Sequence, residues 1–367
     1  MAELKKKITL TVTNDLTYDQ RMQKIGRSLC AAGFEVELVG RIRNYSKPLT
    51  EEPFKQTRLR CFIHKGKLFY IEYNLRLLIY LLFCKTEAIC AVDLDTIVPV
   101  FIAGWLKRVK LIYDAHEYFT EVPEVIHRKR VQQVWQWVEK TFVPKFHLAY
   151  TVSPAIARLF SDKYHTPFHV IMNVPVWKEK AIGENSHSNY ILYQGALNEG
   201  RGIEHLLKAM QQIDARLLLA GEGDLSQHLR ELAIQLKVED KVEFLGYVKP
   251  DELRTITARA TIGINLLENR GLSYYYSLSN KFFDYIHAQV PQICIDFPEY
   301  RELNRKFGVA LLAKDCSVSE IKMLVERLMT DKSLYADLQK KCEVCARTLN
   351  WQQEEQKLTA LYHELLR

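Results

Sequence analysis

The sequence predicts an α/β protein made of two successive Rossmann-like domains, each with a doubly wound parallel sheet. Short apolar strand patterns alternate with helical patterns from Ile8 onward, and the alternation restarts at Tyr190. The chain has 367 residues, 48% of them hydrophobic, which is too long for one typical core. Pro175 and the polar stretch from Asn173 to Ser188 interrupt the pattern, so the domain boundary is expected there.

The first half opens with a strand, a helix and a second strand. We predict a strand at Ile8 to Thr13, a helix at Gln20 to Ala32 ending at Gly33, and a strand at Glu35 to Gly40. This order implies parallel strands covered by helices on both faces. Further strands, each followed by polar residues, are expected at Ala88 to Val92, Val109 to Tyr113 and Leu148 to Val152.

The second half repeats this order. Its last segment, Trp351 to Leu366, has amphipathic periodicity and is expected to be a helix that packs on either half. Strands are expected at Tyr190 to Gln194, Ala215 to Ala220, Val242 to Leu245, Thr261 to Asn265 and Val290 to Ile295, with helices that begin at Gly202, Leu225 and Pro250.

Charge is shared unevenly between the two halves. Residues 1–175 hold 26 Lys and Arg against 17 Asp and Glu, whereas the remainder holds 25 against 27. The basic first half is therefore the expected partner of any anionic surface.

Several classes of protein are disfavoured by what the sequence lacks. The basic start at Lys5 to Lys7 runs into a strand without the apolar core of a secretion signal, and the longest strictly apolar stretch, Leu77 to Phe83, is too short to span a bilayer. Eight scattered cysteines fit a reducing cytoplasm. Cys342 and Cys345 are spaced like a metal pair but lack a second pair or a nearby histidine, so no zinc or redox role is expected.

The most informative stretch for function is a polar turn at Ser279 and Asn280, followed by Lys281 and Asp284. The turn precedes a helical pattern, and a helix N-terminus with a lysine beside it suits a phosphate or diphosphate. Asp284 lies one turn from Asn280, where a carboxylate can accept hydrogen bonds from ribose hydroxyls. The alternative is an ordinary capped helix with a solvated lysine and aspartate.

Two glycine-containing loops follow strands of the second half. The loop from Gly195 to Gly202 resembles a P-loop, but Arg201 replaces its lysine and Gly202 its hydroxyl residue, so an ATPase is disfavoured while diphosphate binding is not. A plain strand-to-helix turn is the alternative. The loop at Gly221 to Gly223 lacks the third glycine of a dinucleotide fingerprint, which disfavours a dehydrogenase.

In the first half, ionisable residues follow two strands. Asp114, His116 and Glu117 end one strand, and Asp93 and Asp95 end another, so all five are expected to open onto the same cleft. A histidine there can donate to a sugar hydroxyl, and the carboxylates can orient it or accept hydrogen bonds from an acceptor hydroxyl. The alternative is that these acids are helix caps.

Taken together, these motifs resemble glycosyltransferase family 4. The resemblance covers nearly the whole chain, and it rests on the order and spacing of the motifs more than on any one of them. They are Asp114 to Glu117, Tyr193 to Gly195, Gly200 to Gly202, Gly221 to Gly223, Phe244 to Tyr247 and Ser279 to Tyr285.

The resemblance implies the GT-B architecture, in which two Rossmann-like domains face each other across a cleft. It implies an acceptor-side domain at 1–175, a domain for the nucleotide-sugar donor at 176–350, and a helix at 351–367 that returns to the first domain. Members are typically retaining, metal-independent transferases, so a hexosyl-type transferase is expected. The implied co-substrates are a nucleotide-diphosphate sugar and a glycan or lipid-linked acceptor, as in cell-envelope polysaccharide synthesis. No cofactor, metal or nucleic-acid partner is implied.

Roles carry over position by position. His116 matches the histidine beside the donor sugar, and Asp284 stands where the family has the second glutamate of its paired-acid motif. The implied catalytic positions are His116, Arg201 and Lys281; the donor-binding positions are Gly195, Arg201, Gly246, Tyr247, Ser279, Asn280, Lys281 and Asp284; the acceptor-side positions are Asp93, Asp95, Asp114 and Glu117.

The chain departs from the family pattern at two places. Tyr276 stands where the first glutamate of the paired motif is expected, and the nearest upstream acid is Glu268. Ala196 replaces a second basic residue that often follows the first glycine of the phosphate loop. These departures keep open the alternative of a non-catalytic nucleotide-sugar-binding protein. A GT-B sugar-nucleotide epimerase, which shares the fold but has no acceptor, is the rival enzyme.

The segment from Lys65 to Lys85 interleaves apolar and basic residues. Its composition is typical of an interfacial helix, and the basic first half strengthens that interpretation, while a core helix packed on its own sheet is the alternative. The sequence thus predicts a cytoplasmic protein, with peripheral contact to the inner face of an anionic membrane as one interpretation of this helix.

Overall fold

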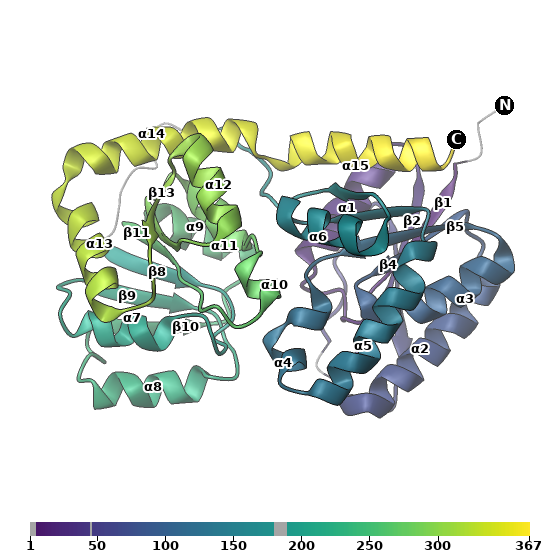
Figure 1. The fold of residues 1–367 in the computed structure, drawn as a ribbon, viewed down its shortest axis with the longest axis horizontal. Coiled ribbons are helices and arrows are strands. Elements are labelled where there is room, and N and C mark those ends of the chain that lie inside the picture. Colours follow the sequence, from purple (N-terminus) through teal and green to yellow (C-terminus); the bar gives the residue numbers. More distant parts are fainter. Residues whose placement is uncertain (1–4, 45, 180–188) are drawn as a thin grey trace. The chain divides into compact units, whose positions relative to one another are not determined.

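A computed structural model describes residues 5–44, 46–179 and 189–367 of the chain (Figure 1). The chain divides into two compact units. Unit 1 comprises Met1–Asn173 and Glu354–Arg367, and unit 2 comprises Val174–Gln353. The part of the expected boundary that falls on 180–188 lies outside the described residues.

Unit 1 is built on a seven-stranded sheet whose described strand pairs are all parallel, in the order β3-β2-β1-β4-β5-β6-β7. The strands are β1 (Lys7–Thr11), β2 (Glu35–Ile42), β3 (Lys55–Arg60), β4 (Ala88–Val92), β5 (Lys110–Ala115), β6 (Leu148–Thr151) and β7 (Phe168–Val170). The helices are α1 (Gln20–Ala31), α2 (Gly66–Phe83), α3 (Ile97–Lys107), α4 (Pro123–Ile126), α5 (Lys129–Phe142), α6 (Pro154–Tyr164) and most of α15 (Trp351–Leu365).

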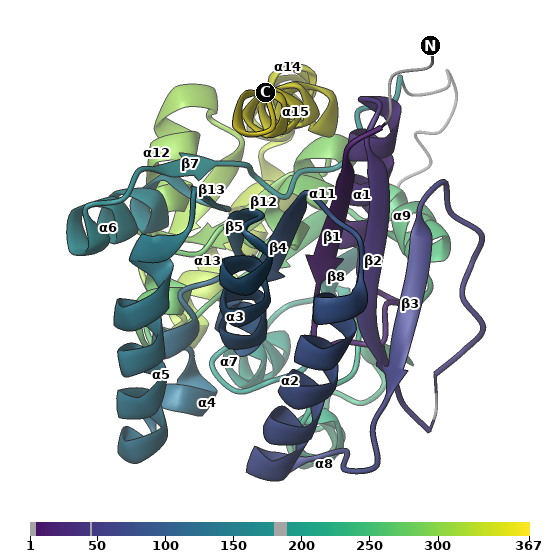
Figure 2. The same cartoon turned by 90° about the vertical axis from the view of Figure 1, so that its right-hand side faces the viewer.

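Helices cover both faces of this sheet (Figures 1 and 2). On one face α15 packs beside α1, because Ser28 donates to Glu355 (2.7 Å) and Phe34 meets the ring of Tyr362 edge-on. On the other face α2, α3 and α5 form a continuous layer. The terminal helix therefore belongs to the first domain, as the fold prediction required.

Unit 2 has a six-stranded parallel sheet in the order β10-β9-β8-β11-β12-β13. The strands are β8 (Tyr190–Gln194), β9 (Arg216–Ala220), β10 (Val242–Gly246), β11 (Ile262–Asn265), β12 (Gln292–Ile295) and β13 (Ala310–Ala313). The helices are α7 (Ile203–Met210), α8 (Ser226–Gln235), α9 (Pro250–Arg259), α10 (Leu272–Tyr275), α11 (Asn280–Ala288), α12 (Pro298–Phe307), α13 (Val318–Thr330) and α14 (Lys332–Thr348).

Each sheet reverses its strand order at one point, between β1 and β4 in unit 1 and between β8 and β11 in unit 2. Loops at the carboxyl ends of the strands diverge there, which is where ligands bind in doubly wound sheets. The expectation of two Rossmann-like parallel-sheet domains is confirmed.

Three strands were not predicted, and all three lie at the edges of their sheets. β3 carries charged residues at an edge of its sheet, while β7 and β13 are short edge strands of three and four residues. Two helices begin one residue later than expected, α7 at Ile203 and α8 at Ser226. Gly202 has φ 68°, so it lies outside the helix as a left-handed cap.

Candidate functional site

The unit 1 site begins with the parallel register of β4 and β5. Val92 pairs with Asp114, and the next amide, of Asp93, donates to the carbonyl of Asp114 (2.9 Å). Asp93 has φ 58° and ψ 176°, a conformation that an L residue adopts at a cost and that is concentrated at functional sites. This turn directs the Asp93 carboxylate to the amide of His116, which donates to it at 2.8 Å.

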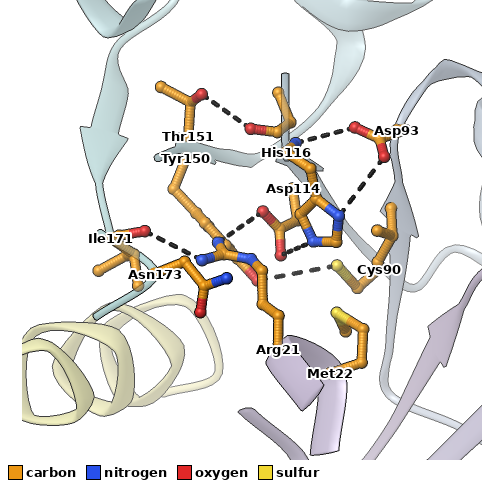
Figure 3. A network of polar contacts seen from close by, with 12 residues as sticks. Arg21, Met22, Cys90, Asp93, Asp114, His116, Tyr150, Thr151, Ile171 and Asn173 are labelled. Atoms are coloured by element: carbon orange, nitrogen blue, oxygen red, sulfur yellow. Dashed lines mark hydrogen bonds and ion pairs between the residues drawn. The ribbon is translucent and has the colours of Figure 1, made fainter. Parts of the chain in front are cut away.

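His116 lies between two carboxylates (Figure 3). Its Nδ1 is 3.5 Å from Asp93 Oδ2, and its Nε2 is 3.4 Å from Asp114 Oδ2. The imidazole keeps 23% of its surface exposed, whereas Asp114 is fully buried. The ring is thus held from both nitrogens while one part of it stays accessible.

A buried arginine completes this network from α1. Arg21 Nη2 donates to Asp114 Oδ1 at 2.9 Å, and its Nη1 donates to the carbonyl of Ile171 at 3.2 Å (Figure 3). Both side chains of the ion pair are at most 5% exposed. Removing one partner of such a pair leaves an uncompensated buried charge.

The protonation of this network follows from its geometry. Burial raises the pKa of Asp114, but Arg21 and His116 outweigh it, so the pKa stays below 3.8. Burial lowers the pKa of His116, yet Asp114 and Asp93 raise it to about 9. Burial raises the pKa of Asp93 to about 8, so at neutral pH the proton between His116 and Asp93 belongs to the pair, and Asp114 is the ionised carboxylate that favours the imidazolium form.

The remaining acceptor-side residues are less tightly held. Asp95 accepts a hydrogen bond from Thr13 at 2.5 Å, and burial raises its pKa to about 6. Glu117 is exposed. Asp93, Asp95, Asp114 and His116 thus gather at one edge of the sheet, and the interpretation of Asp114 as a helix cap is wrong because its carboxylate is committed to Arg21 and His116.

The glycine loops of unit 2 pack backbone against backbone. A Cβ on Gly221 would lie 1.9 Å from the carbonyl oxygen of Gly195, so only glycine fits there. Gly195 has φ 125°, and a Cβ on it would lie 3.7 Å from Nζ of Lys281. The loop after β8 therefore lies against the start of α11.

Lys281 is buried at this point, with 6% of its surface exposed. Its Nζ lies 3.8 Å from the centre of the Tyr193 ring and has no hydrogen-bond partner. Burial and the nearby charge of Arg201 lower the lysine pKa well below 10.5. The expectation of a solvated lysine on an ordinary capped helix is therefore wrong.

Arg201 shows a similar lack of compensation. Its guanidinium lies 4.5 Å from the centre of the Tyr274 ring, and its buried Nε has no hydrogen-bond partner. Two basic side chains that rest on aromatic faces, with buried nitrogens that lack hydrogen-bond partners, form a site suited to an anion.

The N-terminus of α11 adds backbone donors to this site. Ser279 precedes the helix, but its hydroxyl donates to Asn265 (2.8 Å) and its amide to Tyr300 OH (3.0 Å), so its side chain does not cap the helix. Asn280 follows and is exposed. An uncapped first turn carries amides and a partial positive charge that favour a phosphate.

One turn later, Asp284 is held in place by a relay of hydrogen bonds. Gln194 Nε2 donates to Asp284 Oδ2 (2.8 Å), and Thr257 Oγ1 donates to Gln194 Oε1 (2.7 Å). Gln194 is buried, and Asp284 is partly exposed. The carboxylate is thus fixed on the same helix as Lys281.

The other residues expected to contact the donor lie at their predicted strand ends. Gly246 ends β10 with φ 65°, and the neighbouring Tyr247 is 52% exposed. Glu268 is bonded to Arg270 at 2.7 Å, which commits the nearest acid upstream of Tyr276 to an internal ion pair.

Four residues of the two sites were given no role from the sequence, although Tyr193 and Gln194 belong to one of the motifs that carry the resemblance. Arg21 lies 93 positions before Asp114, and no local pattern links them. Tyr193, Gln194 and Tyr274 acquire their roles only by packing against Lys281, Asp284 and Arg201. Gln194 could have been found as the polar residue that ends a buried strand, by the reasoning that identified Asp114.

Within the residues that the structure describes, no cluster of His, Cys, Asp or Glu is arranged to hold a metal ion. Cys342 and Cys345 are buried on α14 and form no disulfide with each other. In the same described part, no helix combines the length and apolar character needed to cross a bilayer.

The chain resembles known proteins in sequence and in structure. Residues 177–343 match the family model described as glycosyl transferases group 1. An uncharacterized glycosyltransferase from Methanocaldococcus jannaschii is 38% identical over 95 residues, 23% of this chain and 24% of the relative. The chain thus spans about a quarter of the length of the curated relative it matches.

Solved structures decide the architecture. Sucrose-phosphate synthase from Thermosynechococcus elongatus has a TM-score of 0.78 at 16% identity, covering 99% of both chains. The chain has the GT-B fold. HepE from Anabaena, solved in complex with UDP-glucose, has a TM-score of 0.75 at 14% identity, over 96% of this chain and 99% of HepE. The group 1 match and the GT-B fold support a GT-B glycosyltransferase, while membership of family 4 stays a prediction.

Proposed function

We propose that this chain is a retaining glycosyltransferase that moves a hexose from a nucleotide-diphosphate sugar to a hydroxyl of a glycan or lipid-linked acceptor. The observation that carries the proposal is the buried amino group of Lys281, which has no hydrogen-bond partner and lies beside Arg201 and the first turn of α11, where a bound anion would favour its protonated form. Burying a cation without compensation is costly, so the site is expected to be completed by an anion.

A nucleotide diphosphate matches the spacing of the unit 2 groups. The diphosphate would take the place between Lys281, Arg201 and the first turn of α11, which begins at Asn280. Asp284 would accept hydrogen bonds from the ribose hydroxyls, and the loop at Gly246 and Tyr247 would border the base. The group 1 match over residues 177–343 supports this assignment, and the HepE complex makes UDP-sugars the first donors to test.

In the proposed reaction, the bond between the anomeric carbon and the diphosphate breaks and the acceptor oxygen bonds to that carbon from the same face. Negative charge develops on the leaving phosphate, where Lys281, Arg201 and the α11 amides stabilise it. The acceptor proton passes to the departing phosphate, which balances the step. Because fixed cations supply the positive charge, we expect no metal requirement.

The unit 1 network would position the reacting sugar and the acceptor. His116, whose imidazolium form is favoured by Asp114, can donate to a hydroxyl of the donor sugar. Asp95 and Asp93 lie at the same sheet edge and can accept from an acceptor hydroxyl. The buried Arg21–Asp114 pair fixes this arrangement before substrate arrives. With reduced cysteines throughout the described chain, we place the reaction in the cytoplasm.

The proposal is tested by following nucleotide release from a panel of UDP-, GDP- and ADP-sugars, with and without cell-envelope lipids and glycans. Release that depends on an acceptor, with a glycosylated product of retained anomeric configuration, is the expected result. Conversion of the sugar nucleotide without an acceptor would identify an epimerase, and binding without turnover would identify a non-catalytic protein; either outcome overturns the proposal.

Paired variants sharpen this test. Arg201→Ala is expected to reduce turnover more than nucleotide affinity, because the leaving phosphate gains charge in the transition state. Arg254→Ala is the matched control, since Arg254 is an exposed arginine of α9. Full turnover of Arg201→Ala would remove Arg201 from the mechanism.

A further inference from the structure

Helix α2 of unit 1 has two apolar faces, and only one of them is buried. Phe69, Tyr73, Leu77 and Leu81, spaced four residues apart, pack into the core of unit 1. The opposite side carries a second stripe at intervals of three or four residues, which places its members on one face of the helix. This outer stripe consists of Leu68, Ile71, Leu75, Ile79 and Leu82, exposed by 37% to 64%.

Packing of α2 on its own sheet explains why the buried stripe is apolar, but it does not explain why the outer stripe is apolar. A helix at the surface of a sheet normally places polar residues on its outer side. The one acid in α2, Glu72, is already neutralised, because Arg76 lies 2.8 Å away and the amides of Phe62 and Ile63 donate to its carboxylate. The outer side of α2 therefore presents little uncompensated negative charge.

Neighbouring helices extend the apolar surface. Phe83, at the end of α2, is 86% exposed, and Lys107 of α3 donates to the carbonyl of Leu81 (2.8 Å), which brings the two helix ends together. Trp105 and Leu106 on that end of α3 are also exposed. On α5, which packs on α3, Val134 and Trp137 are exposed in turn.

Positive charge accompanies this surface. Lys65 and Lys67 lie at one end of α2 and Lys85 follows the other, and all three are exposed. Between residues 65 and 145 the exposed charged residues are ten Lys and Arg against three Asp and Glu. An apolar stripe between cations complements an anionic lipid surface, whereas a second copy of the same face would bring like charges together.

We propose that the outer stripe of α2, with Lys65, Lys67 and Lys85, docks unit 1 on an anionic lipid surface. The α2 helix also reaches the acceptor-side edge of the sheet: Tyr73 OH donates to the carbonyl of Val12, and Val12 precedes the Thr13 that bonds Asp95. Docking through α2 would thus present the Asp93 and Asp95 edge to molecules held in the bilayer. This proposal goes beyond the proposed transferase activity and does not depend on turnover.

The test is co-sedimentation of the full chain with phosphatidylcholine vesicles, with and without phosphatidylglycerol, in the absence of any sugar donor. Binding to the anionic vesicles, weakened by added salt, is the expected result. Equal failure to bind both kinds of vesicle at low salt overturns the proposal. A failed transferase assay would leave this result standing, so the two proposals fail separately.

Two sets of variants identify the surface. Ile71→Ser, Leu75→Ser and Ile79→Ser together are expected to lower the vesicle partition coefficient roughly a hundredfold. Ile234→Ser, Met323→Ser and Val344→Ser, at exposed apolar positions of unit 2, are the matched control and should change it little. Equal losses in both triple variants would overturn the assignment to α2.

Variants of the lysines test the electrostatic part of vesicle binding without changing an apolar side chain. Lys67→Gln with Lys85→Gln should lower binding to anionic vesicles roughly thirtyfold, while Lys314→Gln with Lys340→Gln should not. Sedimentation velocity tests whether the outer stripe of α2 instead joins two copies of the chain. A stable dimer that the Ile71, Leu75 and Ile79 variant converts to monomer, without vesicle binding, would assign the surface to a second copy and overturn the lipid proposal.

Discussion

The two units place charged residues at equivalent points of the same fold but compensate them differently. In unit 1, at the strand ends beside the reversal between β1 and β4, Arg21, Asp114, His116 and Asp93 neutralise one another through contacts of 2.9 to 3.5 Å. In unit 2, beside the reversal between β8 and β11, Lys281 and Arg201 lie on the rings of Tyr193 and Tyr274 with buried nitrogens that have no hydrogen-bond partner.

This difference distinguishes a site whose charges are paired within the protein from a site whose basic groups lie on aromatic rings. The charges of the unit 1 network are paired with one another, so it can hold His116 in position before substrate binds, although Arg21 Nε, Asp114 Oδ2 and His116 Nε2 lack hydrogen-bond partners. The unit 2 cations carry a desolvation cost that an anion would relieve. The comparison therefore assigns orientation to unit 1 and binding of the charged group to unit 2.

The largest expected effect is on turnover, when the partly exposed His116 of the unit 1 network is replaced. His116→Ala should lower turnover by about two to four powers of ten, as expected for a positioned polar catalyst. Initial rates with the accepted donor measure it, and His127→Ala, at an exposed histidine of the same unit, is the control. An unchanged rate would leave His116 as a structural histidine.

Stability of this variant depends on pH. The pKa of His116 rises from 6.5 to about 9 on folding, so the folded state binds more protons between these values. The stabilising contribution is complete below pH 6.5 and is lost as pH rises through 9. Thermal melting should show His116→Ala closest to the unaltered chain near pH 9, and a constant difference at all pH values would contradict the assigned shift.

The next effect is on folding. Arg21→Met should lower the free energy of unfolding by up to about 3 to 5 kcal/mol, because it leaves the buried Asp114 carboxylate to be compensated by the partly exposed His116. Denaturant titration measures the change. Arg130→Met on α5 of the same unit is the control, since Arg130 is exposed and a surface substitution is expected to change the free energy of unfolding by about 0.5 kcal/mol or less.

A smaller effect concerns the nucleotide. Asp284→Ala should weaken binding of the nucleotide by roughly one to two powers of ten, since a hydrogen bond to a charged group contributes about 1.5 to 3 kcal/mol. Calorimetry measures this, with the exposed Asp240→Ala as control. Unchanged affinity in Asp284→Ala would remove the ribose assignment.

The smallest effect has the opposite sign to that of Arg21. Lys281→Met should stabilise the ligand-free protein, because the ammonium is buried without compensation and each unit of pKa depression costs about 1.4 kcal/mol. Its folded pKa lies below 10.5, so the unfolded chain binds more protons in that interval and stability rises with pH toward 10.5. Lys281→Met should remove this rise in melting experiments.

Destabilisation by Lys281→Met would contradict the comparison, since it would mean that the lysine is satisfied like Arg21. Binding of nucleotide should also distinguish the unaltered chain from Lys281→Met. It should raise the melting temperature of the unaltered chain and do so much less for Lys281→Met.

Local pattern was enough to predict the fold. The alternation of strands and helices, the glycines after β8 and the helix starting at Asn280 all follow from periods and residue types within a few positions. The same reasoning located Asp93, Asp114, His116, Arg201, Lys281 and Asp284 at strand ends or helix starts, although their roles in donor and acceptor binding remain predictions.

What the sequence determined by itself was the order of elements and the presence of charged residues at their carboxyl ends, because helix and strand periods are local. Only the tertiary structure decided which charges are paired. Arg21 meets Asp114 through a contact spanning 93 positions, whereas Lys281 meets an aromatic ring and no acid. Likewise α2 reads as uniformly apolar, and only packing separates its buried stripe from its exposed one. The pairing of charges and the burial of side chains depend on residues that are distant in the chain, so no local sequence pattern predicts them.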